Sequence, residues 1–483
     1  MHYNVIRRVT GLLLGLFSIT MLPPVLVSII YNEQNHQPFV IGFFTIFLCG
    51  FLLWLSARHA KEELRTRDGF IIAAVFWLSL GLAGAIPFYV STVPSLSLTD
   101  AIFESISGLT TTGATVISGL DELPKSILFY RQQLQWLGGM GIIVLAVAVL
   151  PMLGIGGMQL YKTETPGPVK DSKLTPRITE TAKALWEIYA GLTIACTLAY
   201  WGAGMSFFDA LTHSFSTVSI GGFSTHDASF GFFNNSALNY ICISFMLIAG
   251  INFALHFKVA HSLSFKHYAG NSELKGYVTI IAVHILIILI ALVSYRVFPD
   301  INESLEQTLF QVVSFATTSG FTTTDYASWP SFIPVSLIFL SFYGGCAGST
   351  AGGIKVIRIL IMLKQLGKEV THLIHPHSDM PIKLDHHIVP RTVIHSVWAF
   401  FSAYILSFGV LMILMMATGL NQVTAFSAVA STLNNLGPGL GDISQTFASI
   451  PDPSKWVACL SMLLGRLEIF TLLVLFTPTF WRD

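Results

Sequence analysis

Long runs of apolar residues dominate the chain and alternate with short polar segments. Ten of these runs have about 20 residues or more, the length that an α-helix needs to cross about 30 Å of hydrocarbon. The ten runs are residues 9–31, 38–57, 69–90, 131–153, 182–204, 237–257, 276–298, 331–362, 391–418 and 455–480. The pattern predicts an all-α polytopic membrane protein. An even number of spans places both termini on the same side.

Four further apolar stretches are too short to cross a membrane and too apolar for exposed loops. They are residues 99–112, 207–221, 305–319 and 423–436. Each ends in a glycine-containing sequence, and the four align without gaps on Gly113, Gly222, Gly320 and Gly437. Polar residues suited to a helix start stand thirteen positions earlier: Asp100, Asp209, Gln307 and Thr424. We therefore expect four re-entrant half-helices, each followed by a glycine loop.

The aligned glycines show that one unit is repeated four times: spanning helix, half-helix, glycine loop, spanning helix. We expect two extra N-terminal transmembrane helices in residues 1–60. The repeats should then cover residues 61–165, 166–265, 266–370 and 371–483. Four such units can close around one axis. The predicted fold is two N-terminal helices plus four helix–pore-loop–helix repeats around a central pore.

Basic residues gather in the segments on one side of the predicted spans. Of the 26 Lys and Arg residues, 21 lie in the two terminal segments, in alternate loops, or, for Lys355 and Arg358, at the adjoining end of a span. The positive-inside rule places that side, with both termini, in the cytoplasm. Asp and Glu also total 26, so the net charge is zero, which excludes a nucleic-acid binder held by a basic face.

The glycine loops have a composition that suits a filter for monovalent cations. Each half-helix directs the negative end of its dipole at the axis, and loop carbonyls outside the helix can replace a cation's water shell. Pores selective for divalent ions usually carry acidic rings, whereas these loops carry no ionisable group. The predicted filter residues for such a cation are Thr111, Thr112, Gly113, Ile220, Gly221, Gly222, Thr318, Ser319, Gly320, Asn435, Leu436 and Gly437. Acidic residues beyond the loops could concentrate cations: Asp121, Glu122, Asp227, Asp325 and Asp442.

Two other features depart from an ordinary span. Residues 344–353 include five glycines, which should break the eighth run near the middle of the bilayer. We interpret this segment as an intramembrane gating loop, although close helix packing through small residues is an alternative. Arg466 lies about 15 Å inside the last run, where a charge is costly and usually functional; a buried ion pair with Glu468 is the alternative. The predicted gate residues are Gly344, Gly345, Gly348, Gly352, Gly353, Lys355 and Arg466.

Several of these motifs resemble the bacterial Trk-type potassium uptake proteins, in particular the TrkH subgroup. The loops read LTTTGATVISGLDELP, SIGGFSTHDAS, TTSGFTTTD and TLNNLGPGLG, and the other segments are FYRQQLQWLGGMGIIVLAVAVLP, GGCAGSTAGGIKVIR and LLGRLEIFTLLVLFTPTFW. The similarity extends over essentially the whole chain. One departure is Ala351, at a position where the family usually has glycine.

The resemblance implies a four-repeat potassium pore in the bacterial inner membrane, assembled as a homodimer. It also implies a separate cytoplasmic, ring-forming, nucleotide-binding regulatory subunit of TrkA type. The family's filter glycines fall on the four aligned glycines of this chain, its gating loop on residues 344–353 and its gate arginine on Arg466.

The sequence as a whole predicts potassium uptake without a cofactor on this chain and without an enzymatic activity. HExxH, GxSxG, GxGxxG and Walker A sequences are absent, and Ser349 has no evident partner for nucleophilic chemistry. A coupled symporter that moves K⁺ with H⁺ or Na⁺ is the alternative. Glu468 would be the main candidate for a proton relay in that case.

Overall fold

The computed structural model describes residues 2–60, 66–141, 178–330, 332–376, 380–385 and 387–482. Helices make up most of this part, which also has a two-stranded antiparallel pairing of β1 (Lys383–Leu384) with β2 (His387–Ile388). Five helices among the described residues are long and apolar enough to cross a membrane, or up to seven if each bent pair is one span. The predicted all-α membrane fold is confirmed. The predicted run 131–153 lies partly outside the described residues.

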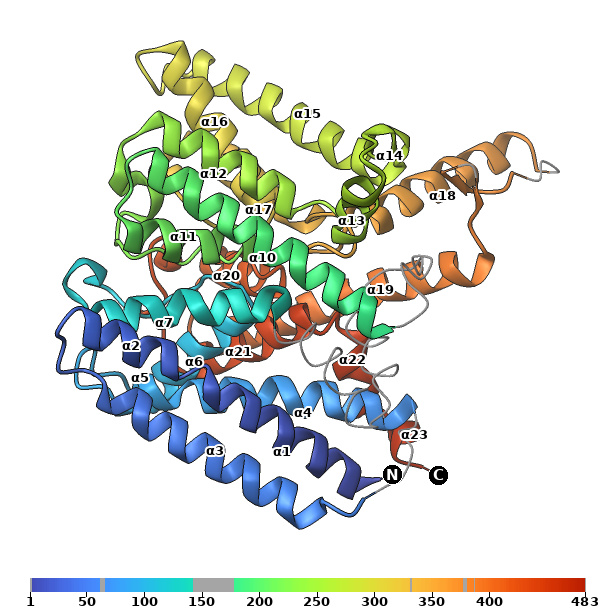
Figure 1. Cartoon of the computed structure of the whole chain (residues 1–483). Helices are drawn as coiled ribbons and strands as arrows, with labels where there is room; N and C mark the ends of the chain where they lie inside the picture. Colours follow the sequence, from blue (N-terminus) through green and yellow to red (C-terminus); the bar gives the residue numbers. More distant parts are fainter. Residues whose placement is uncertain are drawn as a thin grey trace.

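The N-terminal part consists of three helices at one side of the molecule. The first predicted run forms α1 (Tyr3–Ile19) and α2 (Leu22–Ile30), with prolines in the first turn of α2. Proline is favourable there because its missing N–H has no helical partner in any case, so the prolines mark a helix boundary within this run. The next run forms α3 (Gln37–Ala57), which lies beside α1. Figure 1 shows α1 and α3 outside α4 and both chain ends at one end of the molecule.

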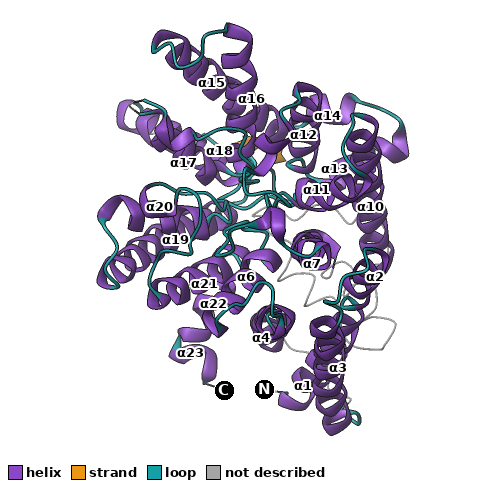
Figure 2. Cartoon of the chain, turned by 90° about the vertical axis from the view of Figure 1, so that its left-hand side faces the viewer, coloured by secondary structure: helices purple, strands orange, loops and turns teal. Residues whose placement is uncertain are grey.

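Four units of the predicted kind follow. Their first helices are α4 (Thr66–Gly84) with α5 (Ile86–Val90), α10 (Ile178–Gly202), α15 (Ser272–Ser294) and α19 (Arg391–Ala417). Their half-helices are α6 (Leu98–Leu109), α11 (Phe207–Ser219), α16 (Ile301–Ala316) and α20 (Gln422–Leu433). Their second helices begin as α7 (Lys125–Trp136), α12 (Ser236–Ala249), α17 (Ile333–Tyr343) and α21 (Asp452–Arg466). Figure 2 shows the units arranged around a centre in which loops gather.

Shorter elements complete the described chain. The helices are α13 (Phe253–Ser262), α14 (Lys266–Gly270), α18 (Val356–Ile374), α22 (Phe470–Leu473) and α23 (Pro478–Trp481). The 3₁₀ and π turns are η1 (Leu120–Glu122), η2 (Leu137–Gly141), η4 (Ser229–Phe233), η5 (Tyr326–Ser328), η6 (Gly441–Ile443) and η7 (Val474–Phe476). The buried apolar residues form two large clusters, one joining the N-terminal helices to the first and fourth units, the other joining the second and third units.

The half-helices begin before the positions that the sequence suggested. Their caps are Ser97, Ser206, Asp300 and Asn421, whose side chains accept from backbone N–H groups in the first turn. Asp100 and Asp209 lie three residues after their caps and receive hydrogen bonds from the cap hydroxyls at 2.8 and 2.7 Å. In these two half-helices the cap is therefore the serine three residues before the acidic residue. Gln307 lies within α16.

Each second helix is interrupted at a similar place. The interruptions are the π turn η2, a 94° bend between α12 and α13, the segment between α17 and α18, and a 108° bend between α21 and the following helix. The predicted spans at 237–257 and 455–480 are therefore bent helix pairs and not single straight helices. A Cβ atom on Gly138 or Gly465 would lie 1.8 or 2.2 Å from the last carbonyl of the neighbouring half-helix, at Leu109 or Leu433. Two of these breaks therefore lie in close contact with the end of a half-helix. Composition alone does not reveal such a contact.

Candidate functional site

The four predicted glycine loops have the same backbone conformation. The glycines have φ between 76° and 101°, and the residues two positions earlier have φ between 53° and 63°: Thr111, Ile220, Thr318 and Asn435. In every loop the N–H just before the glycine donates to the carbonyl of a serine five residues earlier, at 2.8–2.9 Å. Positive φ is unfavourable for Thr and Ile, so the surrounding structure must impose it. Residues that align in the sequence are therefore equivalent in space.

The loops form a closed ring in chain order. A Cβ atom on Gly113 would lie 2.2 Å from the oxygen of Gly221, and one on Gly222 would lie 2.0 Å from that of Ser319. A Cβ atom on Gly320 would lie 2.0 Å from the oxygen of Leu436. One on Gly437 would lie 2.6 Å from the oxygen of Thr112, in the first loop. The backbones therefore meet around one axis at a separation that no side chain fits.

The side chains around this ring are buried and uncharged. The non-glycine members of the predicted filter are at most 2% exposed: Thr111, Thr112, Ile220, Thr318, Ser319, Asn435 and Leu436. Asn435 donates from Nδ2 to Thr112 Oγ1 at 2.9 Å and so ties the last loop to the first. The ring lies at the C-terminal ends of four half-helices, where partial negative charge accumulates without an ionised group.

Residues 344–353 lie directly against the half-helix ends. The N–H of Gly352 donates to Thr318 Oγ1 at 2.7 Å, and the N–H of Gly353 donates to the carbonyl of Asn434 at 3.1 Å. The Thr350 hydroxyl donates to the carbonyl of Val218 at 3.0 Å. This segment therefore contacts the second, third and fourth units at once.

The same segment is also held by Glu273, which the sequence did not single out, and by Lys355, one of the predicted gate residues. Glu273 Oε1, on α15, accepts from the N–H groups of Ala347 at 2.7 Å and Ile357 at 3.2 Å. Lys355 donates from Nζ to the carbonyl of Ala351. Positive φ occurs at Gly344, Gly348, Gly353 and Lys355, so the backbone follows an irregular path. Glu273 is a carboxylate at the start of an apolar helix, and this was the sequence signal that could have identified it.

Arg466 lies beside the first filter loop. Its guanidinium donates to the carbonyls of Gly138 and Gly139, the latter at 2.7 Å, and to Thr111 Oγ1 at 3.3 Å. The carboxylate of Glu468 lies 2.5 Å from Arg358 Nη2. The structure therefore pairs Glu468 with Arg358, whereas the alternative interpretation of Arg466 had paired Glu468 with Arg466.

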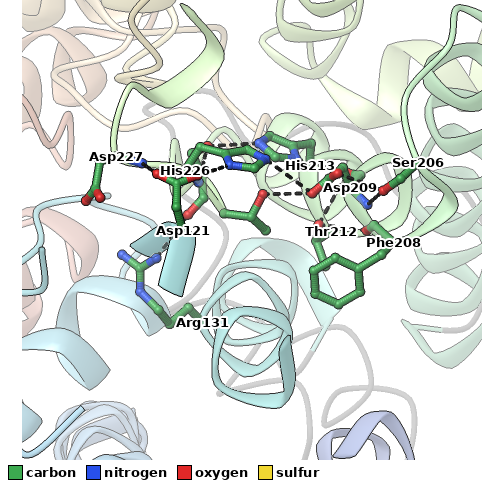
Figure 3. A network of polar contacts seen from close by, with 11 residues as sticks. Asp121, Arg131, Ser206, Phe208, Asp209, Thr212, His213, His226 and Asp227 are labelled. Atoms are coloured by element: carbon green, nitrogen blue, oxygen red, sulfur yellow. Dashed lines mark hydrogen bonds and ion pairs between the residues drawn. The ribbon is translucent and has the colours of Figure 1, made fainter. Parts of the chain in front are cut away.

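The outer loops of the first two units are joined by a polar network (Figure 3). The carboxylate of Asp227 accepts from the N–H groups of Gly119 at 3.0 Å and Leu120 at 2.9 Å. His226 forms a hydrogen bond with Asp121, and its Nε2 lies 3.6 Å from Asp209 Oδ1. Two of the acidic residues expected at the mouth, Asp121 and Asp227, thus connect neighbouring loops.

His226 should make stability depend on pH. Its burial disfavours the charged imidazole, but hydrogen bonds and charges of Asp209 and Asp121 outweigh this and raise the pKa of His226. A raised folded-state pKa stabilises the protein fully below about pH 6.5 and less as pH rises through the folded-state pKa. We expect His226→Gln to remove this pH-dependent part, about 1 kcal/mol or less for such a partly exposed group. The difference in melting temperature between wild type and variant should thus shrink from acidic to alkaline pH.

The control for this prediction is His267→Gln, because His267 is exposed on the short helix α14. Melting curves of the purified protein in detergent at several pH values provide the measurement. A His226→Gln protein whose pH dependence equals that of wild type would show that the contacts of His226 contribute nothing to stability.

The ligand chemistry of the site is that of carbonyl oxygens. In the described ranges, no group of three or more His, Cys, Asp or Glu side chains could hold a metal ion. The ring of backbone oxygens at four helix C-termini can instead replace part of the hydration shell of a weakly hydrated cation.

The chain resembles known proteins over its full length. A family model described as "TrkH: Cation transport protein" matches residues 35–482. "Trk system potassium uptake protein TrkH" of Vibrio parahaemolyticus is 55% identical, and that of Escherichia coli K12 is 52% identical, with 100% of each chain covered. TrkG of Escherichia coli K12 is 42% identical over 100% of this chain and 99% of its own.

A solved structure shows the same similarity. The crystal structure of the potassium transporter TrkH from Vibrio parahaemolyticus superposes with a TM-score of 0.91. The two chains are 53% identical, and each is covered completely. The chain therefore belongs to the TrkH family of cation transport proteins, a family of transporters rather than enzymes.

Proposed function

We propose that this protein takes up potassium across a bacterial inner membrane through a channel-like pore. The observation that carries the proposal is the closed ring of four loops, in which each filter glycine touches a carbonyl of the next loop. Relatives at 52–55% identity are named as potassium uptake proteins, which supports K⁺ as the transported ion. The twelve filter residues predicted from the sequence are the proposed potassium-binding residues.

The proposed selectivity follows from the oxygen ligands. K⁺ gives up its water more readily than smaller or divalent cations, so neutral carbonyl oxygens can compensate its dehydration. The dipoles of four half-helices add negative potential at the same point. Because the filter residues are uncharged, divalent ions lack the acidic ring that usually binds them.

The proposed gate has two parts, the segment 344–353 and Arg466. The segment hydrogen-bonds to three of the four units next to the filter, which is the place where an obstruction would block ions. Arg466 lies beside the remaining loop and carries a positive charge there. In this proposal, conduction requires the segment to move away from the half-helix ends.

The remaining parts of the proposal concern assembly and topology. From the distribution of basic residues, we propose that both termini lie in the cytoplasm. We also propose that the N-terminal helices and the four repeats are divided after residues 60, 165, 265 and 370, of which residue 165 lies outside the described ranges. The "system" in the relatives' names supports a separate regulatory subunit, for which we propose a cytoplasmic nucleotide-binding ring of TrkA type. We also propose a homodimer in the lipid bilayer.

Coupled symport with H⁺ or Na⁺ is the second candidate. It is supported by one buried oxygen of Glu468, Oε1, that has no hydrogen-bond partner in the structure. The other oxygen of this carboxylate pairs with Arg358, so part of the group already has a structural partner. The closed ring of loop carbonyls accounts for ion passage without a proton relay, so the channel is preferred.

Ion uptake into proteoliposomes tests the function. We expect K⁺ and Rb⁺ to enter down their own gradients and divalent ions to be excluded. Imposing a pH or sodium gradient should leave the K⁺ flux unchanged once the membrane potential is clamped. A flux that follows the proton or sodium gradient would establish symport, and the absence of K⁺ uptake would contradict both candidates.

The gate can be tested at Gly352. A Cβ atom there would lie 1.9 Å from the carbonyl of Asn434, so Gly352→Ala should push the segment away from the filter. If the segment obstructs the pore, basal Rb⁺ flux should rise about tenfold, as expected for about 1.4 kcal/mol of lost barrier. Deleting part of residues 344–353 should have the same effect.

The matched control is Gly367→Ala, because the position of its Cβ has open space. Its basal flux should equal that of wild type. Unchanged basal flux and normal regulation in Gly352→Ala would favour a purely structural role for the segment in helix packing.

A further inference from the structure

A buried polar side chain stands behind three of the four filter loops, nine residues before the glycine. Glu104, His213 and Gln311 occupy this position, and each is fully buried. Each reaches the chain just after its filter glycine: Glu104 Oε2 accepts from Val116 N at 3.0 Å, His213 Nε2 lies 3.0 Å from Ser224 Oγ, and Gln311 Nε2 donates to Thr323 Oγ1 at 3.4 Å. These side chains therefore brace the outer end of each loop against its half-helix.

In the fourth unit, a different residue makes the equivalent contact. It has Ala428 at the equivalent position, and the preceding residue, Ser427, makes the contact. The Ser427 hydroxyl donates to the carbonyl of Leu440 and accepts from its N–H, both at 2.9 Å. The group that makes this contact is thus a carboxylate in the first unit, an imidazole in the second, an amide in the third and a hydroxyl in the fourth.

In the first unit this contact is made by an ion pair that is buried from solvent. Arg131 Nε lies 2.8 Å from Glu104 Oε1, and the two side chains are 1% and 0% exposed. Thr115, two residues after the filter glycine, donates its hydroxyl to the Glu104 carboxylate at 3.0 Å and accepts from Arg131 Nη2 at 3.1 Å. Buried charges are costly unless they are fully paired. The remaining donors and acceptors of the Glu104–Arg131 pair form hydrogen bonds with the filter loop.

Arg131 also joins the first loop to the second. Its Nη1 donates to the carbonyl of Ser224 at 3.0 Å, while the hydroxyl of Ser224 contacts His213. Its guanidinium stacks over Phe223, with 4.2 Å between the guanidinium carbon and the ring centroid. Figure 3 shows Arg131 and His213 within the same network of polar contacts. One continuous network therefore fixes two adjacent quarters of the ring.

Building on the proposed carbonyl filter, we propose that Glu104, Arg131 and His213 are positioning residues for potassium selectivity. They hold the first and second loops at a spacing that suits K⁺ and resist their closure around the smaller Na⁺. The rigidity comes from charge-assisted hydrogen bonds, which are about twice as strong as neutral ones. The ions themselves contact the backbone and not these side chains.

Two isosteric changes test the proposal. Thr115→Val removes the hydroxyl that Glu104 and Arg131 share, and Glu104→Gln removes the charge of the pair. We expect the K⁺ over Na⁺ preference to fall about tenfold in each, corresponding to about 1.4 kcal/mol of lost discrimination. The maximal K⁺ flux should change much less. Thr115→Ser keeps the hydroxyl and should restore selectivity.

The control for these variants is Gln133→Leu. Gln133 is a buried polar residue on the same helix, α7, but its side chain donates to the carbonyl of Thr20 and not to a filter loop. Its loss should leave selectivity unchanged. Permeability ratios from K⁺ and Na⁺ flux in proteoliposomes, normalised to folded protein, give the comparison.

The outcomes separate this proposal from the proposed function. Wild-type selectivity in folded Thr115→Val would overturn the positioning role, whatever the stability of Glu104→Gln. If the wild-type protein does not discriminate K⁺ from Na⁺, the carbonyl filter itself fails. If the wild type discriminates and Gln133→Leu loses selectivity as strongly as Thr115→Val, the effect comes from general destabilisation and the positioning role is also overturned.

Discussion

Gly113→Ser and Gly320→Ser should each remove most of the preference for K⁺ over Na⁺. Cβ atoms at these positions would lie 2.2 and 2.0 Å from carbonyl oxygens of the next loop, and both backbones have positive φ. The ring must open to admit the side chain, which moves the proposed ligands. We expect a fall in selectivity of at least about tenfold, or about 1.4 kcal/mol, measured as competing Rb⁺ and Na⁺ uptake.

Gly119→Ser is the control that distinguishes the effect of steric crowding from the effect of backbone strain. Gly119 also has positive φ, at 74°, but a Cβ atom there meets nothing within 4 Å. This variant should lose some stability and keep its selectivity. Unchanged K⁺ over Na⁺ preference in folded Gly113→Ser and Gly320→Ser would remove the loops from the filter.

Arg466→Ala should raise ion flux in the absence of a regulatory partner. A fixed positive charge about 6 Å from the ion path, at an effective dielectric constant of about 20, repels a cation by about 2–3 kcal/mol. Removing it should increase flux by about one to two orders of magnitude. Arg466→Lys should give an intermediate result, because a lysine keeps the charge but cannot bind Thr111 and two carbonyls with one planar group.

The charge-removal control is Arg296→Ala, because Arg296 is exposed in the turn that follows α15. Its flux should equal that of wild type. Rb⁺ uptake is normalised to correctly folded protein, so that loss of stability does not count as loss of conduction. Flux at or below the wild-type level in well-folded Arg466→Ala would contradict the gate assignment.

Much of the fold could be predicted because its signals are local. A stretch of about 13 apolar residues is too short to span a membrane, and this alone identified the four half-helices. Alignment on four glycines then identified residues that prove to share one backbone conformation. The glycine signal was reliable because positive φ and close contact between loops both exclude a side chain.

The parts that were not predicted depend on contacts between distant residues. The run around Gly465 is long enough for a single span despite Arg466 and Glu468, and the bend there involves a half-helix end at Leu433. The partners of Arg466 include carbonyls exposed by the π turn at Gly138 and Gly139, a turn that no periodicity indicated. The Glu104–Arg131 pair was overlooked, although a carboxylate inside an apolar half-helix is a signal that it has a partner.

The order of the ring also has a consequence for biosynthesis. Its last contact joins Gly437, near the end of the chain, to Thr112, which lies in the first quarter of the chain. Pairings between distant residues form slowly, because a long loop must first close. The first three loops therefore cannot form a closed ring before the fourth loop has been synthesised. A truncated chain without the fourth loop has no complete ring, so any function that depends on the closed ring requires the finished chain.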